Sequence, residues 1–133
     1  MARADRVPLT RIGGLLRVSV FINGRVQARL IVDTGAARFV VSPRIAERLG
    51  IDLNYPLGRE RLVGVGQSDL VPVVRLTRVQ VGASVVDGIL AAVYDLPPEI
   101  PTDGLLGLSF LSHFRVTFEF DTRTLVLREL PRR

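Results

Sequence analysis

One short stretch limits what this chain can fold into: residues 30–36, with the sequence LIVDTGA. Three apolar residues predict the end of a buried strand, and Asp33 then stands where that strand meets the surface. A carboxylate is costly to bury unless its charge is paired or it shares a proton. The DTG triplet also fits an ordinary turn, because Asp, Thr and Gly all favour turns. On these residues alone, a turn and a functional aspartate both stay open.

The residues before this stretch predict a β-hairpin that ends on Asp33. Apolar residues alternate with other residues over 16–22 and again over 25–32, which is the period of a half-buried strand. Between the two lies Asn23-Gly24, the strongest short-range signal for a hairpin turn. The second strand of this hairpin is therefore expected to carry Asp33 at its end.

Two further stretches give the aspartate a context. Residues 103–108, DGLLGL, place an apolar pair and Gly107 about seventy residues after Asp33. Residues 62–70, LVGVGQSDL, place two glycines around Val65; glycine permits the conformations of a hairpin tip and the close approach of a peptide, although an ordinary exposed hairpin is the alternative. Together these stretches resemble the retropepsin-like (retroviral-type) aspartic proteases and their bacterial relatives. In that family a DTGA loop carries the catalytic aspartate, an apolar-apolar-Gly segment packs beneath it, and a flap hairpin closes over the substrate.

The resemblance implies an aspartic endopeptidase that hydrolyses extended polypeptide substrates, with apolar residues preferred on both sides of the cleaved bond. Pepsin-like enzymes carry two such motifs in a chain over twice this length. One motif in 133 residues therefore implies a homodimer, since a two-fold axis supplies the second aspartate. The catalytic residues implied are Asp33, Thr34 and Gly35, and the substrate-binding residues are Gly35, Ala36, Gly64, Val65, Gly66, Leu105 and Leu106.

The sequence departs from the viral members at two places. Ala37-Arg38 follows the DTGA motif where viral members carry acidic residues that hold the peptide backbone. Leu108-Ser109 follows the LLG segment in place of a polar pair that supports the viral dimer. We therefore expect substrate positioning and the mode of dimerisation to differ from those of the viral enzymes.

Composition excludes several other kinds of site. The chain has no cysteine and a single histidine, His113, which excludes thiol catalysis and thiolate zinc sites and argues against a Ser-His-Asp triad. We expect no metal and no cofactor. The net charge is +5, but all 18 basic residues are arginines scattered along the chain, and aromatic residues make up only 6%. A nucleic-acid partner is therefore not expected.

The chain shows no sign of a membrane segment or a leader. It has no apolar run long enough to span a bilayer, and residues 1–10 lack the apolar region of a signal peptide. The expected location is the cytoplasm.

Short strands with turn signals between them predict an all-β fold, here a single-domain retropepsin-like β-barrel with a flap hairpin and one or two short helices. One helix is predicted over residues 44–49, begun by Ser42-Pro43 and ended by Gly50. A second is predicted over residues 109–113, before a final hairpin that is expected to close the sheet. The expected division is a loose N-terminal arm (1–14), a protease domain (15–130) and a C-terminal tail (131–133).

Two rival interpretations stay open. The first is a non-catalytic protein-interaction or dimerisation module on the same fold, against which the intact DTG triplet argues. The second is an unrelated small β-barrel binding domain in which the triplet is only a turn, against which the LLG segment argues.

Overall fold

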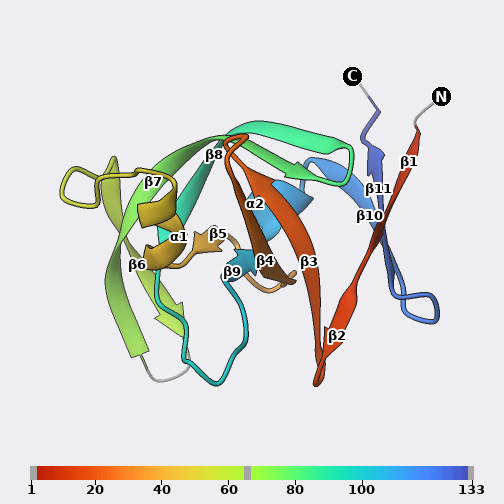
Figure 1. Ribbon diagram of the computed structural model, residues 1–133, viewed down its shortest axis with the longest axis horizontal. Coiled ribbons are helices and arrows are strands. Elements are labelled where there is room, and N and C mark those ends of the chain that lie inside the picture. The colour runs from red at the N-terminus through yellow and green to blue at the C-terminus, as the bar shows by residue number, and fades with distance from the viewer. Residues whose placement is uncertain (1–2, 65–66, 132–133) are drawn as a thin grey trace.

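The computed structural model describes residues 3–64 and 67–131 of the chain (Figure 1). In this range the chain is built of strands with two short helices, which confirms the predicted all-β, single-domain fold. No helix in the described range is long and apolar enough to cross a membrane. The elements are β1 (Ala4–Pro8), β2 (Thr10–Ile12), β3 (Leu15–Ile22), β4 (Val26–Val32), β5 (Phe39–Val41), α1 (Pro43–Arg48), β6 (Gly58–Gly64), β7 (Gln67–Val81), β8 (Ser84–Val93), β9 (Gly104–Leu106), α2 (Leu108–Leu111), β10 (Phe114–Glu119) and β11 (Thr124–Glu129).

The strands form two sheets. The larger has eight strands in the order β2-β3-β4-β9-β5-β8-β7-β6, and an additional pairing of β3 with β7 folds it back on itself. The smaller has the order β1-β11-β10 and stands at the right of Figure 1. The final hairpin is present as predicted, but it belongs to this small sheet and does not close the large one.

The predicted hairpin of β3 and β4 is confirmed. Side chains alternate between core and surface along both strands, and the register pairs Ile22 with Val26. Asn23 and Gly24 both adopt positive φ angles, of 55° and 63°, and the Arg25 amide donates to the Ile22 carbonyl at 3.0 Å. This is the backbone geometry for which an Asn-Gly pair is selected in hairpins.

The predicted first helix is confirmed together with its caps. The Ser42 hydroxyl accepts a hydrogen bond from the Ile45 amide at 3.2 Å, and Pro43 occupies the first helical turn. Gly50 follows the helix with a φ of +75°, a conformation that favours glycine at a helix end. Ile45 and Ala46 are fully buried, so the helix packs its short apolar face on the core.

The N-terminal arm is more ordered than the sequence suggests. Residues 4–8 form β1, which pairs with β11 of the same chain, and residues 10–12 form β2, which pairs with β3. Val7 and Leu9 are buried in the main core. The Asp5 carboxylate accepts hydrogen bonds from the Ala83 amide at 3.0 Å and from the Ser84 hydroxyl at 2.6 Å. The expectation of a loose arm is therefore wrong for this segment, because buried side chains and a polar contact fix it to the β7–β8 turn.

Candidate functional site

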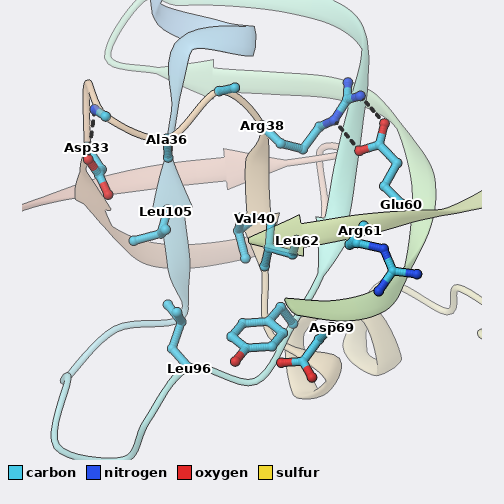
Figure 2. Close-up of a pocket in the computed structure, with 13 residues that line it drawn as sticks. Asp33, Ala36, Arg38, Val40, Glu60, Arg61, Leu62, Asp69, Leu96 and Leu105 are labelled. Carbon is cyan, nitrogen blue, oxygen red and sulfur yellow. Dashed lines mark hydrogen bonds and ion pairs between the residues drawn. The ribbon is translucent and has the colours of Figure 1, made fainter. Parts of the chain in front are cut away.

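Asp33 lies directly after β4, where β9 supports it from below. β9 is parallel to β4 and antiparallel to β5, and so separates the two strands that flank the Asp33 loop. The Asp33 amide donates to the Leu106 carbonyl at 3.1 Å. The Asp33 carboxylate accepts from the Gly35 amide at 2.9 Å, the contact dashed beside Asp33 in Figure 2. The carboxylate is half-buried, so a fixed loop presents it at the surface.

Glycines flank β9 because the backbone around it leaves no room for side chains. A Cβ at Gly104 would lie 2.0 Å from the Val40 carbonyl oxygen. A Cβ at Gly107 would lie 2.5 Å from the Ala36 carbonyl oxygen and 2.6 Å from that of Arg38. The GLLG segment therefore fits beneath the Asp33 loop only with glycine at both ends.

The start of α2 ties down the other end of the Asp33 loop. The Leu108 amide donates to the Ala36 carbonyl at 2.8 Å, and the Ser109 amide donates to the Ala37 carbonyl at 3.0 Å. The Ser109 hydroxyl accepts from the Phe39 amide at 2.8 Å. Leu108-Ser109, noted above as a departure from the viral pattern, thus holds the loop within its own chain.

Asp33 borders a cleft of about 800 Å³ that opens between its loop and the β6–β7 hairpin (Figure 2). The side chains that line this cleft are a mixture of apolar and charged groups. They are Asp33, Gly35, Ala36, Ala37, Arg38, Val40, Glu60, Arg61, Leu62, Asp69, Tyr94, Leu96 and Leu105.

The structure brings part of the predicted site together in this cleft: Asp33, Gly35, Ala36 and Leu105 line it. Thr34 is exposed beside Asp33 and does not line it. Leu106 points the other way, fully buried in the main core. The contribution of Leu106 to the site is its carbonyl group, which holds the Asp33 amide.

The predicted flap corresponds to the β6–β7 hairpin, whose last described pair is Gly64 with Gln67. Val65 and Gly66, which the sequence assigned to substrate contact, lie outside the described residues. The described residues of this hairpin that line the cleft are Glu60, Arg61 and Leu62 of β6 and Asp69 of β7.

One charged pair in the cleft was not anticipated from the sequence. Arg38 and Glu60 form a two-point ion pair, with one bond from Arg38 Nε to Glu60 Oε2 at 3.0 Å and a second from Arg38 Nη2 to Glu60 Oε1 (Figure 2). Both side chains are partly exposed. The pair joins the segment after the DTGA motif to β6, so it connects the Asp33 loop with the base of the flap. The only signal was Arg38 itself, standing where viral members have an acid.

Asp69 and Tyr94 are the second polar pair that the sequence did not reveal. Partial burial raises the pKa of the Tyr94 phenol above its usual range. The nearby negative Asp69 carboxylate raises this pKa further, and Asp95 makes a smaller contribution. Tyr94 follows β8, where its amide donates to the Val41 carbonyl at 3.0 Å. The two side chains come from segments that only the folded sheet places together.

Asp103 does not join Asp33 as a second catalytic carboxylate. It does not line the cleft, and its carboxylate accepts a hydrogen bond from the Arg29 amide at 2.9 Å. Asp103 therefore holds the edge of β4 several residues before the DTG triplet.

Comparisons with known structures agree with this architecture. The fold is similar to that of a retropepsin-like aspartic protease from Rickettsia conorii, with a TM-score of 0.73 and 24% sequence identity over 97% of this chain and 92% of that one. It is also similar to the retroviral protease-like domain of Ddi1 from Leishmania major, with a TM-score of 0.59 and 22% identity over 88% of this chain and 94% of that one. These likenesses confirm the predicted retropepsin-like fold.

At the level of sequence, a comparison with curated proteins found no match. The family model described as "gag-polyprotein putative aspartyl protease" matches residues 18–113. This range is more than half of the chain and includes the DTGA loop, the β6–β7 hairpin and the GLLG segment. The chain therefore belongs to the gag-polyprotein aspartyl protease family.

Proposed function

We propose that this protein is an aspartic endopeptidase that acts as a homodimer, with Asp33 of each copy contributing to one active site. The observation that carries the proposal is the fixed position of Asp33 at the border of the cleft, held by the Leu106 carbonyl and the Gly35 amide. Thr34 and Gly35, next to it, complete the motif.

The chemistry requires two carboxylates and one water molecule. Two carboxylates in contact cannot comfortably both ionise, so they share a proton. The ionised member takes a proton from the water, which attacks the carbonyl carbon of the peptide bond, and the protonated member donates to the carbonyl oxygen. No cofactor takes part in these steps.

The need for a second copy follows from the carboxylates of a single chain. Glu60 is bound by Arg38, and Figure 2 shows both Glu60 and Asp69 on the side of the cleft away from Asp33. Asp103 lies outside the cleft. A two-fold axis beside the exposed Thr34 would place two Asp33 side chains together from one motif per chain.

The substrate would be a polypeptide bound as an extended strand. β6 is the edge strand of the large sheet on one side of the cleft, and Gly35 lines the other side. Extended peptides are commonly held through their main chain. Leu105 and Leu62 give the cleft its apolar surface, which suits apolar side chains next to the cleaved bond.

The test is a mixing experiment with wild type and Asp33→Asn. Cleavage of an unfolded protein is measured from about pH 3 to 8, the range that a carboxylate pair can span. The two proteins are then mixed at constant total concentration and allowed to exchange subunits. If each active site needs Asp33 from both copies, an equal mixture retains about one quarter of wild-type activity, whereas independent monomers retain about one half.

The result distinguishes four cases. Inactive Asp33→Asn protein with a quadratic dependence on the wild-type fraction supports the proposal. A linear dependence contradicts the shared site. Equal activity in Asp33→Asn shows that the activity belongs to a contaminant, and absence of activity under all conditions favours a non-catalytic module on the same fold.

A further inference from the structure

The wall of the cleft formed by the flap carries a carboxylate without a counter-ion. Asp69 stands on β7 opposite Leu62 of β6, and its side chain is exposed in the cleft. Among the residues that the structure describes, none of the ion pairs includes Asp69. Its neighbour is the uncharged phenol of Tyr94, whose pKa the Asp69 carboxylate raises. An ionised carboxylate with a neutral partner can still attract a cation.

The other charged side chains of this wall form no ion pair with Asp69 in the part of the chain that the structure describes. Glu60 is bound at two points by Arg38, so that pair is neutral as a unit. Arg61 also lines the cleft, but none of the ion pairs of the described residues joins it to Asp69. On this wall Asp69 is therefore the carboxylate that no ion pair of the described residues includes.

Apolar groups lie next to this carboxylate. Figure 2 shows Val40 and Leu62 above Asp69, and Tyr94 contributes a half-buried ring. Long basic side chains bury their methylene groups on apolar surface while the charged group stays in water, and a guanidinium group also packs well on an aromatic ring. An apolar surface that leads to an unpaired carboxylate suits such a side chain.

We infer that Asp69, Val40, Leu62 and Tyr94 form a subsite that takes a basic side chain, arginine above all, of the polypeptide substrate. The inference rests on the proposed function, because it describes how the same cleft selects its substrate. It adds a charged requirement to the apolar preference expected from the sequence. Leu105, closer to Asp33, remains the apolar contact next to the cleaved bond.

In a symmetric dimer, the preference for a basic side chain would apply on both sides of the cleaved bond. Each copy would supply one such subsite at an equal distance from the two Asp33 side chains. The preferred substrates would therefore carry basic residues at matching positions on both sides of the cleaved bond, and one arginine would improve a substrate less than two.

The test compares peptides that differ only in charge. Each position of a cleavable peptide is occupied in turn by arginine or by citrulline, which has the same shape without the charge. We expect kcat/KM to favour arginine by about fivefold at one position. Asp69→Asn abolishes this ratio, whereas Asp95→Asn keeps it, because Asp95 is an exposed loop residue outside the cleft. The ratio also falls as salt is added.

A binding measurement separates this inference from the proposed function. The same peptides are titrated into Asp33→Asn protein, in which cleavage is removed but the subsite is intact. Tighter binding of the arginine peptide, lost on adding Asp69→Asn, supports the subsite even if wild type cleaves nothing. A ratio that Asp69→Asn leaves unchanged, an equal loss in Asp95→Asn, or no binding and no cleavage of either peptide overturns it.

Discussion

Gly107→Ala tests whether the GLLG segment (residues 104–107) fixes the Asp33 loop by close backbone contact. The new Cβ would meet the Ala36 carbonyl oxygen at 2.5 Å and the Arg38 carbonyl oxygen at 2.6 Å, against an ordinary contact of at least 3.4 Å. Relief requires the loop to move by about 0.9 Å relative to α2. The φ of Gly107 is −99°, so alanine is not strained by its own backbone and the cost is purely steric.

Such a movement has a calculable effect on stability. The two hydrogen bonds from the start of α2 to the loop measure 2.8 and 3.0 Å, and neither survives an extension of this size. Each contributes about 0.5–1.5 kcal/mol, and overpacking adds roughly 1–3 kcal/mol. We therefore expect Gly107→Ala to lower the free energy of unfolding by about 2–6 kcal/mol.

Activity should fall by more than the loss of folded protein explains. Asp33 lies in the same loop, and a displacement of about 1 Å at a reacting group costs on the order of 100-fold in rate. Urea unfolding at one protomer concentration gives the stability, and cleavage is measured where circular dichroism shows the variant to be folded. Gly14→Ala is the control, because a Cβ there meets nothing within 4 Å and Gly14 has no positive φ. If Gly107→Ala matches Gly14→Ala in both measurements, the steric argument is wrong.

Three further predictions concern polar contacts. Asp5→Ala should lower the free energy of unfolding by about 1–2 kcal/mol, because two donors of the β7–β8 turn lose their acceptor; an unchanged urea midpoint would contradict the anchored arm. In a double-mutant cycle, the effects of Arg38→Ala and Glu60→Ala on the free energy of unfolding should be coupled by about 0.5–1 kcal/mol. The coupling should be weaker in high salt because the pair is partly exposed. Strictly additive effects would show that the ion pair does not contribute to stability. The deprotonation of Tyr94 can be followed by ultraviolet titration as the difference between wild type and Tyr94→Phe, and it should occur above the usual tyrosine range. Asp69→Asn should lower the midpoint of this titration, but the part of the pKa increase that is due to burial should remain. Because the folded-state pKa of Tyr94 is raised, the stabilisation linked to Tyr94 is present below its unfolded-state pKa and is lost as pH rises through its folded-state pKa. If Asp69→Asn left the Tyr94 titration midpoint unchanged, the interaction between Asp69 and Tyr94 would be contradicted.

Local signals in the sequence predicted the parts of the fold that depend on neighbouring residues. Asn23-Gly24 specifies its turn through backbone conformation, and Ser42 and Gly50 specify the ends of α1 in the same way. The N-terminal arm was misjudged because polar residues surround its buried positions. Val7 and Leu9 become core residues only when β1 meets β11, more than a hundred positions later in the chain.

The charged wall of the cleft could not be predicted for a related reason. Arg38 and Glu60 are 22 positions apart. Asp69, near the start of β7, and Tyr94, directly after β8, come together only at the far end of the long β7–β8 hairpin. These residue types are common in loops and at strand ends, so the composition does not indicate that these four residues line a cleft. By contrast, Asp33 was recognisable because its motif is contiguous. The proposed catalytic residue is thus indicated by a local motif, whereas the proposed substrate preference depends on contacts that exist only after folding.

The GLLG segment (residues 104–107) contributes both to the fold and to the proposed active site. Its two glycines let β9 enter between β4 and β5, its first leucine lines the cleft, and its second fills the core while its carbonyl holds the Asp33 amide. Four consecutive residues therefore set the depth of the cleft, the packing beneath it and the position of the carboxylate. A substitution in this segment leaves Asp33 itself unchanged but is still expected to displace its carboxylate. The segment should therefore tolerate substitutions less well than any surface loop of equal length.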